Sequence, residues 1–231
     1  MRPVRTWPAF LIPLAFVVGC ASAADRLNDG IALQSQGRFV EAVYRYAEAV
    51  EKDGELVEAR DRLLAAGDSA VMVAMDRADA MERRGDPVGG AAEYRAVDRM
   101  LARAREVGVR IPLPGDYSAI RRALFDTAIN WQMVRGDEAA QAGRWDVARD
   151  FYIGARGDYL PSRDQVEESY DAETNLLMSW AGIALEDDQP RFAFELAEEA
   201  LGVRSSPPRE TVLAVRDLQD VAVEQGTVVL A

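Results

Sequence analysis

Apolar residues recur every three or four positions along most of the chain, which is the spacing that places them on one face of a helix. Alternation typical of a strand occurs only near the end, in residues 227–230. Glycine, proline and acidic clusters interrupt the helical pattern often enough to delimit about nine helices. We therefore expect an all-α fold of four antiparallel helix pairs followed by one C-terminal helix.

The expected pairs share one pattern around their internal turns. Five, nine and twelve positions after each turn stands a small, aromatic or branched apolar residue. A small residue lets two helices approach closely, and an aromatic ring one turn later fills the remaining space. The turn residues are Gly37, Gly85, Gly143 and Asp188. The packing residues are Ala42, Tyr46, Ala49, Gly90, Tyr94, Val97, Ala148, Tyr152, Ala155, Ala193, Ala197 and Ala200. Gly30 and Gly136 each stand seven positions before a turn.

This pattern resembles the tetratricopeptide repeat, whose helix pairs stack into a solenoid, and the resemblance covers residues 24–204. The turns lie 48, 58 and 45 residues apart, whereas the family's period is about 34 residues. Some helices must therefore be longer than standard, as rods over residues 55–84, 116–142 and 162–186, with Gly67 as the candidate break. A helical bundle without repeats is the alternative fold.

In tetratricopeptide repeats the first helix of each pair lines the concave, partner-binding surface. The resemblance therefore places Met75, Met133 and Met178 at equivalent binding positions, with Asn130 and Asn175 equivalent to each other. A methionine side chain adapts to different apolar partners, and an asparagine amide both donates and accepts hydrogen bonds. The alternative is that the methionines only fill the core.

The first residues have the composition of an export signal. Arg2 and Arg5 precede an apolar run over residues 9–18, which is too short to cross a bilayer. Residues 17–20, Val-Val-Gly-Cys, resemble the bacterial lipobox. The resemblance implies that Cys20, the single cysteine, becomes the lipidated first residue of the mature chain.

In this interpretation residues 1–19 are a removed signal peptide, residues 20–23 are a short tether, and the helical-repeat domain covers residues 24–225. Ala21 after the lipidated cysteine, instead of an aspartate, implies the outer membrane, with the protein facing the periplasm. Residues 21–23, Ala-Ser-Ala, also fit an ordinary cleavage site, so a soluble periplasmic protein is the alternative.

Charge and residue composition argue against several classes of function. Removal of residues 1–19 takes away two arginines and no acid, which leaves 25 basic and 39 acidic residues, a net charge of −14. Such a charge disfavours binding to nucleic acid and to anionic lipid headgroups. The chain has no histidine, the commonest general base and metal ligand, and its only lysine is Lys52. We therefore expect no enzymatic activity, no cofactor and no metal.

These observations predict a membrane-anchored scaffold or adaptor that binds another cell-envelope protein, or a peptide segment of one, through a helical-repeat surface. The alternative is an accessory helical domain of a longer periplasmic enzyme or binding protein. The strand-like residues 226–231 would then begin the next domain, because an isolated strand is not stable.

Overall fold

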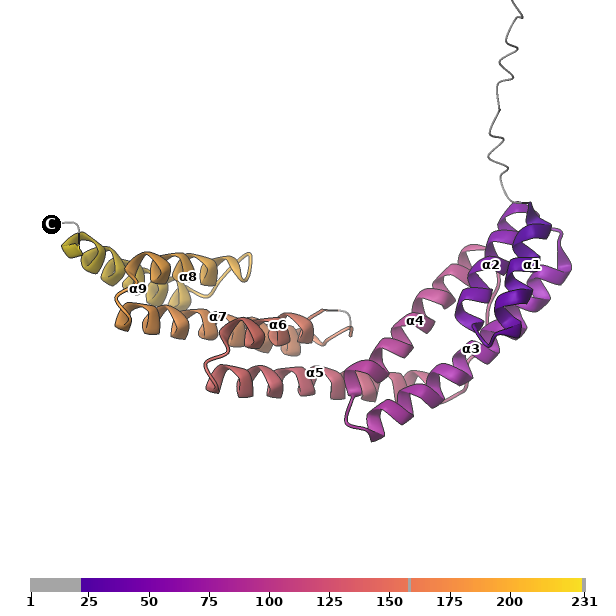
Figure 1. The fold of residues 1–231 in the computed structure, drawn as a ribbon, viewed down its shortest axis with the longest axis horizontal. Helices are drawn as coiled ribbons and strands as arrows, with labels where there is room; N and C mark the ends of the chain where they lie inside the picture. Colours follow the sequence, from indigo (N-terminus) through magenta and orange to yellow (C-terminus); the bar gives the residue numbers. More distant parts are fainter. Residues whose placement is uncertain (1–21, 158, 230–231) are drawn as a thin grey trace, which may run out of the picture.

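The computed structural model describes residues 22–157 and 159–229, and within them every regular element is a helix (Figure 1). The expected all-α class is therefore confirmed for this part of the chain. The nine helices found there are α1 (Ala23–Ser35), α2 (Phe39–Lys52), α3 (Val57–Arg83), α4 (Pro87–Glu106), α5 (Tyr117–Gln141), α6 (Trp145–Ala155), α7 (Arg163–Glu186), α8 (Pro190–Gly202) and α9 (Arg209–Val229).

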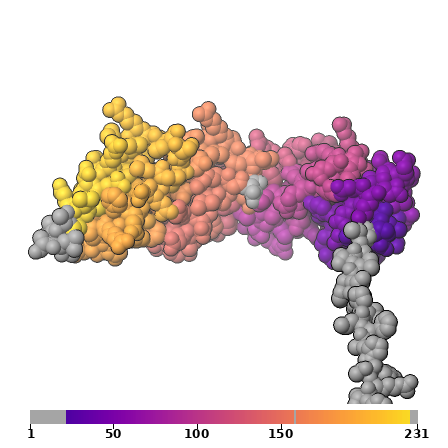
Figure 2. Space-filling view, turned by 90° about the horizontal axis from the view of Figure 1, so that it is seen from above, coloured from indigo at the N-terminus to yellow at the C-terminus, as the bar shows by residue number. Residues whose placement is uncertain are grey.

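Consecutive helices pack as antiparallel pairs, α1 with α2, α3 with α4, α5 with α6 and α7 with α8, and α9 packs on α8. The pairs contact one another in chain order through α2 and α3, α4 and α5, and α6 and α7. The molecule is elongated, with α1 and α9 at opposite ends (Figures 1 and 2). It bends where α4 meets α5 (Figure 1).

The C-terminal tail is helical, contrary to the expectation from the sequence. Residues 226–231 are expected to form a strand, but α9 continues as a helix through Val229, and residues 230–231 lie outside the described part. A strand here would have no neighbour with which to pair. An existing helix, by contrast, gains one hydrogen bond for each residue that it adds.

The four expected turns adopt one geometry. Gly37, Gly85, Gly143 and Asp188 have φ values of 72°, 78°, 69° and 58°. In each turn this residue donates its N–H to the carbonyl three residues back, and the next residue donates to the carbonyl five residues back. These two bonds define the Schellman motif, whose left-handed residue is usually glycine. The next helix begins two residues after the turn residue in all four pairs.

In the first and third pairs, a glycine of one helix faces a tyrosine ring of the other at close range. A Cβ atom on Gly30 would lie 2.4 Å from Cε1 of Tyr46, and one on Gly136 would lie 2.4 Å from Cε1 of Tyr152. Both tyrosines are buried. The other packing positions expected from the repeat pattern are buried as well: Ala42, Ala49, Gly90, Tyr94, Val97, Ala148, Ala155, Ala193, Ala197 and Ala200.

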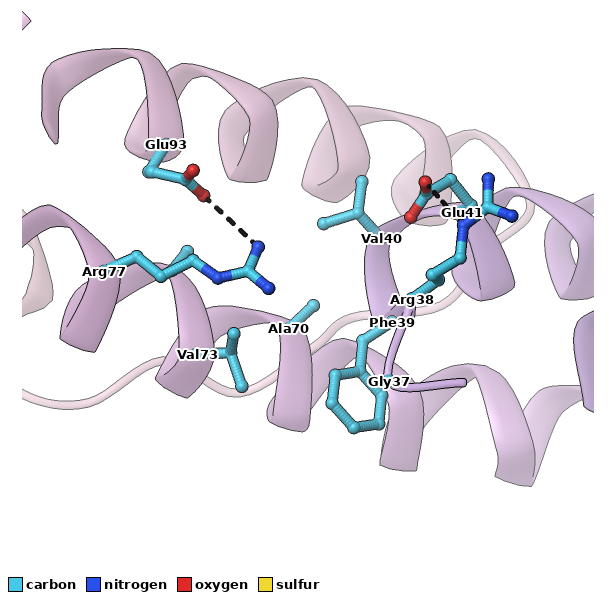
Figure 3. Close-up of a pocket in the computed structure, with 10 residues that line it drawn as sticks. Gly37, Arg38, Phe39, Val40, Glu41, Ala70, Val73, Arg77 and Glu93 are labelled. Atoms are coloured by element: carbon cyan, nitrogen blue, oxygen red, sulfur yellow. Dashed lines mark hydrogen bonds and ion pairs between the residues drawn. The ribbon is translucent and has the colours of Figure 1, made fainter. Parts of the chain in front are cut away.

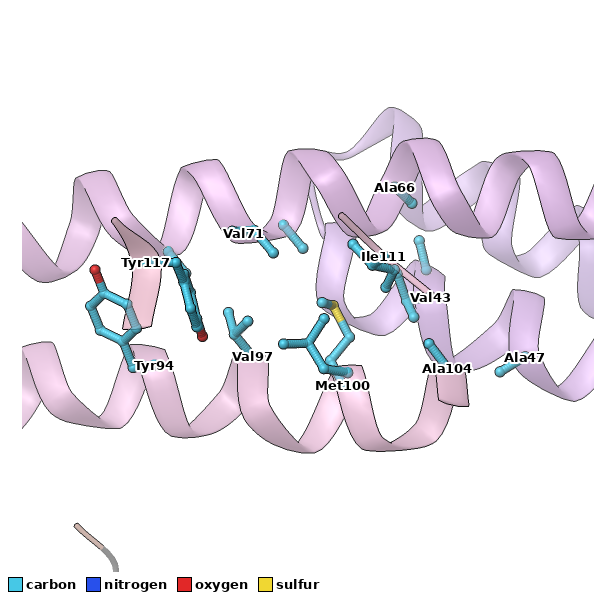
Figure 4. Packing of buried hydrophobic residues seen from close by; sticks show 14 of the residues in the cluster. Val43, Ala47, Ala66, Val71, Tyr94, Val97, Met100, Ala104, Ile111 and Tyr117 are labelled. Carbon is cyan, nitrogen blue, oxygen red and sulfur yellow. The ribbon is translucent and has the colours of Figure 1, made fainter. Parts of the chain in front are cut away.

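The connection between α4 and α5 is packed against the first two pairs. Its Ile111 is buried, and a Cβ atom on Gly67 of α3 would lie 2.4 Å from Cδ1 of that isoleucine. Tyr117, at the start of α5, packs on Tyr94 with ring centroids 5.2 Å apart (Figure 4). Gly67 therefore does not break α3, because its role is to let the connection cross the helix.

We predict that Gly136→Ala lowers the free energy of unfolding by about 1–3 kcal/mol, because the added methyl group overpacks the contact with Tyr152. The matched control is Gly182→Ala in α7, where a Cβ atom meets nothing within 4 Å. That substitution should stabilise by about 0.5–1 kcal/mol through helix propensity alone. Chemical denaturation of both variants measures the difference, and two equal effects would contradict the close approach.

Candidate functional site

Three hollows among the described residues lie where one helix pair meets the next. We call these contacts the first joint (α2 with α3), the second joint (α4 with α5) and the third joint (α6 with α7). At the first joint a hollow of about 140 Å³ is lined by residues 37–41, Ala70, Val73, Ala74, Arg77 and Glu93 (Figure 3). Its charged groups are paired, Arg38 with Glu41 at 3.1 Å and Arg77 with Glu93 at 4.0 Å.

The third joint has two hollows. One, of about 280 Å³, lies among α5, α6 and α7, and we call it the tryptophan hollow. It is lined by Asp137, Ala140, Trp145, Tyr152, Ala172, Asn175, Leu176 and Ser179. The other, of about 320 Å³, lies among α6, α7 and α8, and we call it the arginine hollow. It is lined by Arg149, Ile153, Arg156, Glu173, Glu199, Gly202 and Val203.

A buried glutamate organises the arginine hollow. Glu173 is only 2% exposed, and it accepts hydrogen bonds from Nε of Arg149 at 2.9 Å and from Nη2 of Arg156. Arg149 also pairs with Glu199 at 2.7 Å, and Arg156 also donates to the hydroxyl of Ser169 at 3.2 Å. Burial opposes the charge of Arg149, but its bonds to Glu173 and Glu199 outweigh this and raise its pKa.

This ionic cluster occupies positions that are apolar at the first joint. When the pairs are aligned on their turn residues, Arg149, Arg156 and Glu173 fall where the first joint has buried apolar side chains. The corresponding residues of the first joint are Val43, Val50 and Ala70. The third joint therefore replaces an apolar contact by a glutamate that bonds to two arginines.

The tryptophan hollow, in contrast, contains polar groups that are not fully used. Tyr152 donates its hydroxyl to Oδ1 of Asp137 at 2.8 Å, and burial followed by this hydrogen bond raises the pKa of Tyr152. Asp137 makes no ion pair with any residue that the structure describes, and the side chains of Asn175 and Ser179 make no hydrogen bond there. Trp145 forms part of the wall, and its ring stacks on Trp180.

The residues expected from the sequence to bind a partner do not gather in one hollow. Asn130 and Asn175 are exposed on α5 and α7. Met75, Met133 and Met178 are each half-buried, and they pack against the apolar cores of their pairs. The tryptophan hollow contains Asn175, while the other four lie outside the three hollows described above. Cys20 lies outside the described residues.

Sequence reasoning missed Asp137, Ser179 and Glu173, and it did not single out Trp145 as a wall of a hollow. Glu173 was detectable, because alignment on the turn residues places it at a position that holds alanine in the second and third pairs. A glutamate at a position that holds a small apolar residue in those two pairs is expected to be buried, and a buried carboxylate needs ionic partners. Asp137 and Ser179 carry no such signal, because exposed polar residues are ordinary on helices.

In residues 22–157 and 159–229 no group of three or more histidine, cysteine, aspartate or glutamate side chains is placed to hold a metal ion. None of the helices in those residues has the length and apolar character needed to cross a membrane. No family model, curated protein or solved structure matches the chain.

We predict that Glu173→Ala lowers the free energy of unfolding by about 3–5 kcal/mol, because it leaves two partly buried arginines without their shared partner. The triple variant Arg149→Val, Arg156→Val, Glu173→Ala gives the third joint the residues of the first. It should recover most of that loss, since an apolar contact often equals a buried ion pair in stability. Denaturant titration would contradict this account if the triple variant were as unstable as the single one.

Proposed function

We propose that this protein is a non-enzymatic adaptor that holds another cell-envelope protein, or a segment of one, on the surface of a tetratricopeptide-like solenoid. The observation that carries the proposal is the repetition of one turn geometry in four stacked helix pairs. Stacked pairs produce a long continuous surface, and solenoid proteins use such surfaces to bind partners.

The first helices of the pairs supply the surface that we assign to the partner. When the second and third pairs are aligned on their turn residues, several equivalent positions of the first helix are exposed in both, and we call three of them the first-helix face. They are Met72, Asp76, Asp79, Asn130, Val134 and Asp137. The fourth pair continues this face with Asn175 and Ser179, which line the tryptophan hollow.

The composition supports binding over catalysis. The chain contains no histidine, a single cysteine and a single lysine, so the side chains that most often act as general bases or nucleophiles are scarce. Its charged hollow at the third joint contains carboxylates and guanidinium groups that already pair with one another. Groups held in this way stabilise a joint and are poorly placed to exchange protons with a substrate.

Attachment to the membrane is proposed from the sequence of residues 1–23. A lipid on Cys20 would hold the helical domain at the membrane, with the outer membrane and a periplasmic orientation favoured by Ala21. The net charge of −14 after signal removal repels anionic headgroups, so the lipid would supply the attachment that the protein surface does not.

The anchor is tested by Cys20→Ser. We expect the variant to lose incorporation of radiolabelled palmitate, because the lipid is attached through the sulfur atom, and to move from the membrane fraction to the soluble fraction. If labelling and fractionation of the variant were unchanged, the lipid-anchor proposal would be wrong. If the wild-type protein were exported in soluble form without any labelling, ordinary secretion would be favoured.

The binding surface is tested by the double variant Asn130→Ala, Asn175→Ala. We expect it to reduce crosslinking to the envelope partner while the melting temperature stays nearly unchanged, because an exposed amide bonds to water when no partner is present. The matched control is Gln36→Ala with Gln141→Ala, which removes two exposed amides near turns.

In this experiment the control variant should crosslink as the wild type does. A lower melting temperature with unchanged crosslinking would show that the two asparagines serve the fold. Absence of any envelope partner for the wild type would favour the accessory-domain alternative.

A further inference from the structure

We propose that the tryptophan hollow binds a basic side chain, arginine or lysine, of the partner. This inference rests on the proposed function, because it names the chemistry that the docked segment must bring. It follows from three observations, which concern the unused polar groups of the hollow, its size and aromatic wall, and its uncompensated negative charge.

The three hollows differ in how far their polar groups are already satisfied. In the first-joint hollow each charged side chain has an ion-pair partner. In the arginine hollow, Arg149, Arg156 and Glu173 bond to one another. The tryptophan hollow is different, because its Asp137 accepts only the Tyr152 hydroxyl among the described residues. A carboxylate has about four lone-pair sites, so most of its accepting capacity is left for a donor from outside.

The size and the wall of the hollow fit one long side chain. Its volume of about 280 Å³ lies just below the range of ~300–1,000 Å³ that is typical of small-molecule sites. Trp145 lines it, and the face of an indole ring attracts ammonium and guanidinium groups. Asn175 and Ser179 provide an amide oxygen and a hydroxyl that accept further hydrogen bonds from the same cation.

The charge of Asp137 is left uncompensated where the second pair neutralises its equivalent. Asp79 holds the same place relative to its turn, and Arg83 pairs with it at 2.9 Å. No arginine of the described residues pairs with Asp137. An anionic group entering the hollow would meet this carboxylate and be repelled, whereas a cation would be attracted by it and by the net charge of −12 of the whole chain.

The test uses the full chain with ¹⁵N-labelled tryptophan, and two probes of almost the same shape. N-acetyl-L-arginine amide carries the guanidinium, and N-acetyl-L-citrulline amide carries a neutral urea in its place. We expect the arginine probe to shift the indole N–H signal of Trp145 saturably, and the citrulline probe to bind about fivefold more weakly. A factor of this size corresponds to one partly exposed charged pair.

Three variants locate the effect. Asp137→Asn should weaken the arginine probe by a similar factor of about five, while the asparagine still accepts the Tyr152 hydroxyl. Tyr152→Phe leaves the carboxylate in place and should retain preference for arginine. The control Asp61→Asn removes the charge of another exposed aspartate of α3, which lies outside the first-helix face and outside the three hollows, and it should leave binding unchanged.

Equal binding of the two probes to the wild type, or no saturable shift of the Trp145 signal, would overturn the proposal without any variant. An equal loss in Asp61→Asn and Asp137→Asn would also overturn it, because the effect would then come from the general surface charge. The probe experiment does not depend on a partner protein. If the probes fail to bind while crosslinking to the partner is intact, only the proposal of a basic side chain in the hollow is rejected. If the arginine probe binds as expected while no partner is crosslinked, only the adaptor proposal is rejected.

Discussion

The close contact between a glycine backbone and a tyrosine ring is the constraint on which this architecture depends. Gly30 against Tyr46 and Gly136 against Tyr152 set the distance between the helices of the first and third pairs. A left-handed turn residue is needed so that the second helix can return at this distance. Once the two helices of a pair are packed, their remaining apolar faces have only the neighbouring pair to cover them, and an elongated stack results.

The three joints solve the same packing problem with different chemistry. The first uses small and branched apolar side chains, the second inserts the connection that contains Ile111, and the third buries Glu173 between two arginines. Because a buried ion pair adds little net stability, we interpret the third joint as a device that fixes how its two helix pairs meet. The hollows beside this joint then keep a defined shape, which a binding surface requires.

The turns and the long helices could be predicted because both depend on local signals, which are a left-handed residue, glycine in three of the four turns, and the helical spacing of apolar residues. The continuous helix at Gly67 and the helical conformation of residues 226–229 could not be predicted, because each depends on which residues lie next to the segment in space. The same holds for the candidate site. The sequence shows that Glu173 occupies a position that holds alanine in other pairs. Its arginine partners and the hollow around Asp137 depend on how the helix pairs stack, which the sequence alone does not show.

The central claim is that the first helices carry the binding surface. Site-specific photocrosslinking tests it most directly, with p-benzoylphenylalanine placed at Ser179 on α7 or at Glu198 on α8, two exposed positions of the same helix pair. We predict that Ser179 crosslinks to one envelope protein in living cells and that Glu198 does not. Crosslinking from Glu198 alone, or equally from both positions, would contradict the assignment of the binding surface to the first helices.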